Sequence, residues 1–498
     1  ISPGSVVAEH ANPLTLTGAG SISGGGPVEK RGTGTLTLSS ANSYAGGTIL
    51  KAGTLSLGNA NALGSGTVTL RGGMLATGAL AVPNSIVVES DAVITGGHAG
   101  GNHGVKAISG NGTLTLTATN VFDLEGSLTG FSGKFAFGGS GSFRFFGSAG
   151  SAQADFDLGT RSLSARSGSA FAIGSLAGQS GSVLTGASGS GNNVAVTYTV
   201  GGNHHDSVFN GVITNGNSAS AVTKAGNGRL VLNGVNTYTG ATQVQSGMVV
   251  VNGSLAASAV TVSSGATIAG TGALGGTLAL AANAKLGIAV APALTRGLSV
   301  AGNVTLSGPI DVVAVGVGGT LVAGNYPLLQ YSGTLSGTPQ LTWVPPVAST
   351  LEASFAVQAG RIDLILTEPQ SAFEVWAEQR FGVNAQAAVA GPLEDPDGNG
   401  VANLIEYALG GSAGQTFALG MLPQAQRSGG RLALSFQRIA DPSLTYTVEA
   451  GDSPEAMVSI WASTGAENVA GVVTVQDLPE TVGRATRFMR LRVSGGEE

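Results

Sequence analysis

A segment of 30 residues occurs twice in this chain, and this repetition limits the possible folds more than any other feature of the sequence. Val28–Leu57 reads VEKRGTGTLTLSSANSYAGGTILKAGTLSL, and Val222–Val251, 194 residues later, reads VTKAGNGRLVLNGVNTYTGATQVQSGMVVV. The copies align without a gap, and a shorter third copy lies near Gly110–Phe122. The positions that match between the two long copies include Lys30 and Lys224, Gly32 and Gly226, Leu36 and Leu230, Asn42 and Asn236, Tyr44 and Tyr238, and Gly53 and Gly247.

The repeat unit has the pattern of a short strand between two corners. In Thr35–Leu38 the leucines point to one face and the threonines to the other, because side chains alternate along a strand. Glycines on either side allow the backbone angles that a corner needs. One such turn offers only a thin apolar stripe, and stacking many turns joins these stripes into a core. The sequence therefore predicts an all-β protein with a parallel β-helix, or solenoid, over residues 1–370.

Composition agrees with a stack of strands and excludes several other classes of protein. Glycine supplies 82 of 498 residues, which is more than twice the usual share of about 7%. The net charge of −6 gives no electrostatic basis for binding nucleic acid, and the lack of cysteine excludes disulfides and thiol chemistry. No apolar run approaches the roughly 20 residues of a membrane helix, so we expect no membrane span. Ile1 opens no signal peptide, so we expect the sequence to begin at a processed or trimmed terminus.

The composition changes near residue 370, and we expect a domain boundary there. Residues 1–370 hold 13 acidic and 14 basic residues, whereas residues 371–498 hold 15 acidic and 8 basic ones. We expect Tyr326–Tyr331 and Ile362–Leu366 to close the solenoid. Residues 371–410 should contain helices over Ala372–Phe381 and Ala402–Leu409, and residues 411–498 should form a small antiparallel β-sandwich. The strands expected in this sandwich are Arg431–Arg438, Leu444–Glu449, Val469–Val475 and Phe488–Val493.

An acidic loop between the two expected helices carries the sharpest local motif. Asp395–Glu406 reads DPDGNGVANLIE and fits the twelve-residue calcium-loop pattern at every specified position. Calcium takes six to eight oxygen ligands, and Gly400 provides the sharp turn that such loops need. The sequence therefore predicts a structural calcium site of the EF-hand type. The expected ligands are Asp395, Asp397, Asn399, the carbonyl of Val401, Asn403 and Glu406.

Histidines and paired carboxylates in the solenoid are weaker candidates for chemistry. His204, His205 and Asp206 are the only histidine cluster, and we interpret them as a solvent-facing turn before a strand at Val208. Asp155 with Asp157, and Asp123 with Glu125, form pairs that each share a strand face. Such pairs can serve glycoside chemistry, but we expect these four to be solvated outward positions.

Two tyrosines of the repeat are candidates for binding sugars. Exposed rings at Tyr44 and Tyr238 would stack on sugar rings, whereas buried rings would only pack over a turn. We favour the second alternative because the repeat places both next to a turn asparagine.

The repeat resembles the autotransporter-associated β-strand repeat over the pattern K-x-G-x-G-x-L-x-L-x-x-x-N-x-Y-x-G-x-T. This resemblance implies a right-handed parallel β-helix in a secreted or surface-displayed bacterial protein. The segment DPDGNGVANLIEYALG, followed by LALSFQR and YTVEA, resembles the C-terminal region of such proteins in Verrucomicrobia-like bacteria. An autotransporter usually ends in a membrane barrel of about a dozen strands, each near 10 residues. The residues from 411 onward are too few for that barrel, so we expect no translocator barrel here and export by a general secretion route.

These observations favour a non-enzymatic structural protein that is secreted or held at the cell surface. A rod with two different ends can associate head to tail, and we expect filaments or a surface layer, by end-to-end or lateral self-association. One alternative is an adhesin that binds polysaccharide or a host surface. A second alternative is a polysaccharide lyase or hydrolase on a β-helix, for which Asp155 and Asp157 are the candidate residues.

Overall fold

The computed structural model describes residues 1–98, 104–289, 297–315, 322–345, 350–382, 386–478 and 486–495. The chain divides into two compact units, Ile1–Thr367 and Glu368–Glu498, which we call the solenoid unit and the C-terminal unit.

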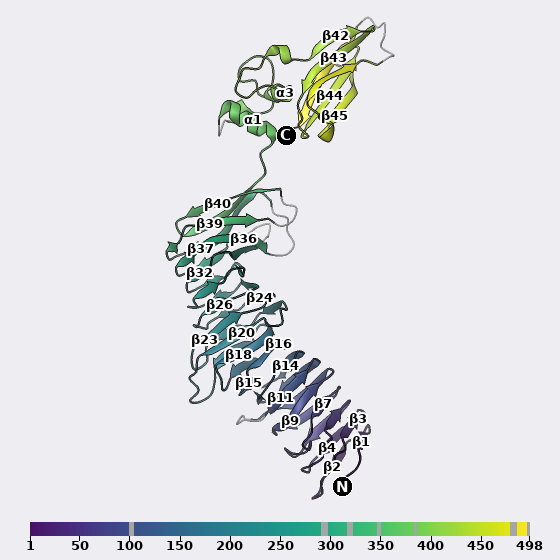
Figure 1. Cartoon of the computed structure of the whole chain (residues 1–498), viewed down its shortest axis with the longest axis vertical. Coiled ribbons are helices and arrows are strands. Elements are labelled where there is room, and N and C mark those ends of the chain that lie inside the picture. Colours follow the sequence, from purple (N-terminus) through teal and green to yellow (C-terminus); the bar gives the residue numbers. More distant parts are fainter. Residues whose placement is uncertain are drawn as a thin grey trace. The chain divides into compact units, whose positions relative to one another are not determined.

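The solenoid unit is a parallel β-helix, as the repeat predicts, and its strands stack coil upon coil along the chain (Figure 1). One sheet runs through the whole stack and contains 16 described strands, one from each successive coil. In order, these strands are β2 (Leu14–Leu16), β4 (Thr35–Leu38), β6 (Thr54–Leu57), β8 (Met74–Gly78), β10 (Ala92–Gly96), β12 (Thr113–Ala118), β14 (Lys134–Gly139), β16 (Gly150–Asp157), β18 (Ala170–Ala177), β20 (Val196–Val200), β23 (Ser220–Lys224), β26 (Thr242–Val244), β29 (Val260–Val262), β32 (Leu278–Leu280), β35 (Val304–Leu306) and β38 (Leu335–Ser336).

A second sheet accompanies the first through the N-terminal coils only, and two shorter sheets replace it afterwards. The second sheet has 11 described strands: β1 (Val6–Glu9), β3 (Val28–Arg31), β5 (Thr48–Leu50), β7 (Val68–Leu70), β9 (Val82–Val88), β11 (Gly104–Gly110), β13 (Val121–Glu125), β15 (Ser142–Phe146), β17 (Ser162–Ala165), β19 (Val183–Ala187) and β22 (Val212–Thr214). The third sheet has β21 (Ser207–Phe209), β24 (Arg229–Leu232), β27 (Met248–Val251), β30 (Thr267–Ala269), β33 (Ala284–Ala289), β36 (Pro309–Val315) and β39 (Gln340–Val344). The fourth has β25 (Val235–Asn236), β28 (Ser254–Leu255), β31 (Ala273–Leu274), β34 (Leu298–Val300), β37 (Gly324–Tyr331), β41 (Arg361–Thr367) and β40 (Glu352–Gln358).

The core is built from side chains that repeat in register from coil to coil. Leu36 pairs with Leu55, and Leu55 pairs with Leu75, so one leucine lies directly over the next. All three are fully buried. Farther along, phenylalanines fill the core: Phe137 continues the row of these leucines, and Phe135 in the adjacent row contacts Phe156 with ring centroids 5.0 Å apart. The aromatic side chains thus supply the bulk of the core where the repeat pattern becomes irregular.

Aligned strands of the two long repeat copies lie in different sheets of the same solenoid. Strand β3 of the first copy belongs to the 11-stranded sheet, whereas the aligned strand β23 of the second copy belongs to the 16-stranded sheet. The coils change from two strands to three where β21 starts the third sheet. Each of these strands in the later copy therefore lies in a different sheet from the aligned strand of the first copy. The repeat specifies the contacts of a coil with its neighbours, but it does not specify which sheet each of its strands joins.

The last described coils end in an antiparallel pair of strands. Strands β40 and β41 pair antiparallel, and β41 also pairs antiparallel with β37. The two expected closing strands are thereby confirmed as parts of β37 and β41. An antiparallel pair at the end of a parallel stack acts as a cap, because it changes the pattern of hydrogen bonds that a further coil would need.

The described part of the C-terminal unit joins three helices to two small antiparallel sheets. The helices are α1 (Ala372–Phe381), α2 (Ala387–Ala390) and α3 (Asn403–Ala408), and short 3-10 turns lie at η1 (Leu419–Met421) and η2 (Gly465–Glu467). One sheet has the order β42 (Gln424–Ser428), β43 (Arg431–Arg438), β46 (Gly471–Gln476), and the other has the order β45 (Met457–Thr464), β44 (Leu444–Gly451), β47 (Phe488–Gly495). Helices and sheets share one core, in which Trp376 and Tyr407 lie with Phe436 and Tyr446. No helix in the described parts of the chain is long and apolar enough to cross a membrane.

Candidate functional site

Matched positions of the repeat form polar contacts between neighbouring coils. The Asn42 side chain accepts a hydrogen bond from the backbone N–H of Ile22 at 2.8 Å and donates to the carbonyl of Ala62 at 2.7 Å. Those two residues lie 20 positions before and after it, so one asparagine connects three coils. Asn236 accepts from Ile213 and donates to Ser254 in the same way.

The repeat lysine is buried, and its ammonium group donates hydrogen bonds to backbone carbonyls at a corner of the coil. The Lys30 ammonium donates to the carbonyls of Arg31, Gly32 and Ala52 at 2.5, 2.7 and 3.3 Å. Lys224 makes the equivalent contacts in the second copy, and burial lowers the pKa of this amine to about 8. Buried ammonium groups need such acceptors, because an unpaired charge is costly to remove from water. The sequence reasoning matched the two lysines but assigned them no role.

Both repeat tyrosines are fully buried, which confirms that they pack within the turn and excludes them as an exposed surface for sugars. The Tyr44 hydroxyl lies 2.6 Å from Thr48 Oγ1, and Tyr238 lies 2.6 Å from Thr242 Oγ1. Burial raises the pKa of each phenol to about 12.

Asp123 contradicts the expectation of a solvated carboxylate. It is fully buried, and its two oxygens accept hydrogen bonds from Arg144 at 2.7 and 2.9 Å. Asp123 and Arg144 face each other in the register of β13 and β15. Because Arg144 binds both oxygens of Asp123 and compensates its charge, this outward-facing carboxylate can be buried.

Asp155 and Asp157 are half-buried and already have partners. Burial acts to raise the pKa of Asp155, but hydrogen bonds from Ser175, His205 and Asn203 outweigh it and leave the pKa below its usual value. For Asp157, burial is outweighed by the ammonium of Lys134 at 2.7 Å. His205 belongs to an exposed turn, as expected, but its contact with Asp155 across 50 residues of sequence was not predicted.

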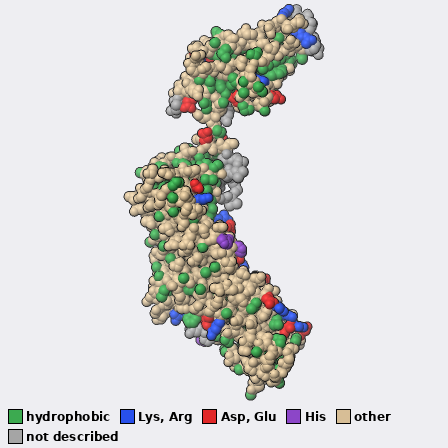
Figure 2. All heavy atoms as spheres, viewed as in Figure 1, with side chains coloured by type: hydrophobic (Ala, Val, Ile, Leu, Met, Phe, Trp, Pro, Cys, Tyr) green, Lys and Arg blue, Asp and Glu red, His purple; other side chains and the backbone are tan. Residues whose placement is uncertain are grey.

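On the face that Figure 2 shows, charged side chains of the solenoid unit gather in a few places. On the 11-stranded sheet, Glu29 contacts both Arg31 on its own strand and Lys51 on the next coil at 2.5 Å. Arg71 and Glu89 form a further pair at 2.5 Å on later coils. We call these five residues the charge ladder.

The acidic loop lies within the C-terminal unit and has the turn geometry that its motif predicts. Gly398 and Gly400 have φ angles of 68° and 85°, in the region that favours glycine. Asp395 accepts hydrogen bonds from the backbone N–H groups of Asn399 and Gly400 at 3.1 and 2.8 Å. These bonds fold the loop back on its first carboxylate.

The end of the loop is anchored on helix α3. Glu406, in this helix, accepts a hydrogen bond from Asn399 Nδ2 at 2.7 Å through Oε1. The next residue, Tyr407, donates to Asp441 at 2.6 Å, and Tyr446 donates to the carbonyl of Ala408 at 2.8 Å. The closing residue of the loop therefore belongs to a helix that is hydrogen-bonded to the sandwich.

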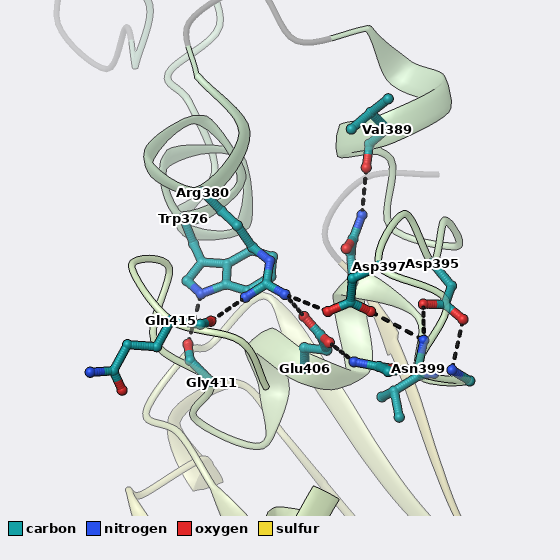
Figure 3. A network of polar contacts seen from close by, with 12 residues as sticks. Trp376, Arg380, Val389, Asp395, Asp397, Asn399, Glu406, Gly411 and Gln415 are labelled. Atoms are coloured by element: carbon teal, nitrogen blue, oxygen red, sulfur yellow. Dashed lines mark hydrogen bonds and ion pairs between the residues drawn. The ribbon is translucent and has the colours of Figure 1, made fainter. Parts of the chain in front are cut away.

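Arg380 is a member of this site that sequence reasoning missed. Its guanidinium Nη2 lies 3.2 Å from Asp397 Oδ2 and 3.0 Å from Glu406 Oε2, while Nη1 donates to the carbonyl of Gln415 at 2.7 Å (Figure 3). The same group lies 5.4 Å from the centre of the Trp376 ring. Its position on α1, far before the loop in sequence, gave no local signal.

Asn403, one of the expected ligands, has a packing role in addition to the one the motif assigns to it. It is 1% exposed, and its amide nitrogen donates to the carbonyls of Val389 and Gly391, both at 2.9 Å. The side chain thereby holds the α2 segment against α3, and only Oδ1 is left for a metal. Across the described residues, no group of three or more His, Cys, Asp or Glu side chains is arranged for a metal ion. The loop's ligands would instead be a mixture of carboxylate, amide and carbonyl oxygens.

Two comparisons with known proteins agree with the fold. Residues 28–57 and 222–251 match the family described as the passenger-associated-transport-repeat. The chain is also 33% identical over 139 residues to the adhesin BmaC autotransporter of Brucella suis biovar 1 (strain 1330), a match that covers 28% of this chain and 4% of that relative. Both findings fit the repetitive β-solenoid described above. Over these segments the chain is similar to the β-repeats of autotransporter passengers, and its stacked coils and buried repeat positions agree with that similarity.

Proposed function

We propose that this protein is a non-enzymatic adhesive solenoid, secreted or displayed at a bacterial surface, whose contact surface is the outer side of the 16-stranded sheet. The name of the relative as an adhesin supports this proposal. The observation that carries it is the length of the uncharged ranks on the 16-stranded sheet, beside which Lys134, Asp155 and Asp157 form a local charged group on β14 and β16.

The outer side of the 16-stranded sheet presents ranks of uncharged residues in register. We call the surface formed by the two ranks described next the uncharged face; it does not include Lys134, Asp155 and Asp157 on β14 and β16. One rank runs from Thr15 through Thr37, Ser56, Ala76, Thr95 and Thr117 to Gly138. A later rank runs from Thr199 through Thr223, Gln243, Thr261, Ala279 and Thr305 to Ser336. The 11-stranded sheet, in contrast, carries the charge ladder.

A neutral polysaccharide has the chemistry that this face complements. Hydroxyl ranks repeat along the sheet at the strand spacing of about 4.8 Å and can both donate and accept hydrogen bonds. Each contact is weak, but a long polymer reaches many coils together, so the contacts add through effective concentration. An acidic or basic polymer would find no counter-charge along these ranks.

Charge placed on the uncharged face tests the proposal. Thr37→Lys with Thr95→Lys should reduce binding of the full chain to insoluble neutral polysaccharides by about tenfold or more, because two ammonium groups would have to be desolvated. Thr69→Lys, on the 11-stranded sheet, is the matched control and should bind as the wild type does. Equal binding by all three proteins, in pull-down with the polymer, would contradict the choice of face.

The proposal excludes a catalytic role for Asp155 and Asp157. A glycosidase needs one carboxylic acid with a raised pKa to protonate the leaving group, whereas both of these pKa values are lowered. Activity against a polysaccharide panel that disappears in Asp155→Ala would overturn this part of the proposal.

Calcium binding by the acidic loop is proposed as a structural brace of the C-terminal unit. Glu406 is 1% exposed, and its Oε2 lies 3.0 Å from Arg380 Nη2. A buried carboxylate needs a cationic partner, and calcium would be an alternative to the guanidinium. Asp395, Asp397, Asn399, the carbonyl of Val401, Asn403 Oδ1 and Glu406 would supply the oxygens. Calcium titration of the full chain tests this, and Glu406→Gln should abolish the binding.

End-to-end assembly into filaments is the second candidate function. Val7 on β1 and Leu14 on β2 are 51% and 42% exposed. Exposed apolar strands of this kind can pair with another copy, although the antiparallel pair of β40 and β41 limits stacking at the other end. Electron microscopy that finds single particles for both the wild type and Val7→Lys at high concentration would rule it out.

A further inference from the structure

We propose that Arg380 is a built-in counter-ion of the acidic loop, which calcium must displace. The inference rests on the calcium site proposed above and concerns how that site is regulated. Its basis is that one guanidinium group contacts two of the residues that calcium would need.

Arg380 contacts the third and the last position of the loop at the same time. Nη2 lies 3.2 Å from Asp397 Oδ2 and 3.0 Å from Glu406 Oε2 (Figure 3). In the calcium-loop pattern, position three gives one oxygen, and position twelve gives both of its carboxylate oxygens. The arginine and the ion would therefore use the same Glu406 oxygen, and both cannot hold it together.

The charged group of Arg380 is largely buried and packs against aromatic rings. The side chain is 9% exposed, and its guanidinium lies within 5.5 Å of the ring centres of both Trp376 and Phe381. Without a cation, Asp395, Asp397 and Glu406 would bring three negative charges together, which is unfavourable. Arg380 compensates part of that charge and lets the loop fold before any metal arrives.

A counter-ion that has to leave lowers the affinity for the metal. Displacing Arg380 breaks two charged contacts and also releases the side chain from the carbonyl of Gln415, to which Nη1 donates at 2.7 Å. The loop would thus stay empty at the submicromolar calcium of a cytoplasm and fill at the roughly millimolar concentrations for which extracellular calcium modules are tuned. Calcium would therefore brace the C-terminal unit only after the protein has reached the outside of the cell.

Calcium affinity of arginine variants tests this competition directly. Isothermal titration of the full chain with calcium chloride should show binding that is about tenfold or more tighter in Arg380→Gln than in the wild type, because the competing charge is gone. Arg380→Met keeps the packing of the side-chain stem against Trp376 and should behave in the same way. The control is Arg427→Gln, which removes an exposed arginine from β42 of the same unit and should leave the affinity unchanged.

Each outcome separates the inference from the proposed site. Binding in the wild type that is unchanged or weakened by both Arg380 variants would overturn the competition and leave the calcium site standing. Binding in the variants but not in the wild type would support the competition in its strongest form. No binding in any protein would refute the calcium site, and the inference with it.

A second measurement leaves Arg380 in place. In a Trp343→Phe, Trp461→Phe protein, Trp376 is the one remaining tryptophan, since the chain has three. Calcium should change its fluorescence as the guanidinium leaves its position 5.4 Å from the ring. Calcium binding without any change in this signal would show that Arg380 stays where it is.

Discussion

At the scale of single residues, the repeat is a set of positions in which the backbone of one coil closely approaches the next. Gly53 has a φ of 67°, and a Cβ atom there would lie 2.5 Å from the carbonyl oxygens of both Gly32 and Gly34. Gly247 meets the carbonyls of Gly226 and Gly228 at 2.4 and 2.5 Å with the same φ. These glycines are therefore required by two independent constraints, the backbone angle and the lack of space.

Gly53→Ala should destabilise the solenoid unit by about 2 kcal/mol or more, because the neighbouring coil cannot move without breaking its own strand pairs. Gly247→Ala should have an effect of similar size. Gly20→Ala is the matched control, since no atom lies within 4 Å of the added carbon and its φ is not positive. Thermal unfolding followed by circular dichroism measures all three, and a shift for Gly20→Ala as large as for Gly53→Ala would refute the explanation.

At the scale of elements, pairs between coils add electrostatic contacts to the hydrogen bonds of the strands. Hydrogen bonds from Arg31 and then Lys51 lower the pKa of Glu29 from its usual 4.5 to about 2. Because the folded-state pKa is lowered, the unfolded chain binds the proton more readily, and stability falls as the pH falls. Glu29 therefore stabilises the fold above about pH 4.5, and this contribution is lost progressively between pH 4.5 and pH 2.

Glu29→Gln should accordingly lower the melting temperature at pH 7 and have little further effect near pH 2. The difference between wild type and variant is the quantity to follow, since other carboxylates titrate in both proteins. Melting curves at several pH values, recorded at low salt to limit screening, measure it. A difference that stays constant down to pH 2 would contradict the role given to this side chain.

The elements that the sequence predicts best are those in which the pattern is local. Strands β4 and β6 follow from leucines that alternate with threonine or serine, and helix α1 runs from Ala372 to Phe381 as its apolar spacing predicts. Strand β45 (Met457–Thr464) was not predicted, because its exposed and half-buried residues do not alternate regularly. Its pairing with β44 also contains a bulge at Val448 and Glu449.

Features that depend on distant contacts could not be predicted. The change from two to three strands per coil leaves no mark in the repeat, since both copies have the same pattern. The acidic loop was found because its residues are consecutive, whereas Arg380 was missed because tertiary packing brings it there. Asp123 shows the same limit, since only the facing Arg144 explains its burial.

At the scale of the whole molecule, the two compact units should respond differently to calcium. The proposed ligands all lie in the C-terminal unit, and the solenoid unit holds none of them. A ligand that binds only the folded state stabilises it by about 2.7 kcal/mol at 100 times its dissociation constant. We therefore expect calcium to raise the melting temperature of the C-terminal unit and to leave that of the solenoid unit unchanged.

Calorimetry of the full chain with calcium and with a chelator measures this difference. Glu406→Gln should remove the calcium-dependent shift, and Glu455→Gln, which removes an exposed carboxylate of the same unit, should preserve it. A shift of the solenoid transition by calcium would show that the ion acts elsewhere.

The shift of the second repeat copy to another sheet bears on how such chains grow in evolution. A duplicated segment needs only the coil before it and the coil after it, because Asn42 and Asn236 each bond to those two neighbours. The new copy can therefore be inherited at a different rotation from its parent and still fold. Lengthening by gene duplication then preserves the contacts between neighbouring coils. Related chains can therefore differ in the number of coils while each coil keeps the same hydrogen bonds to its neighbours.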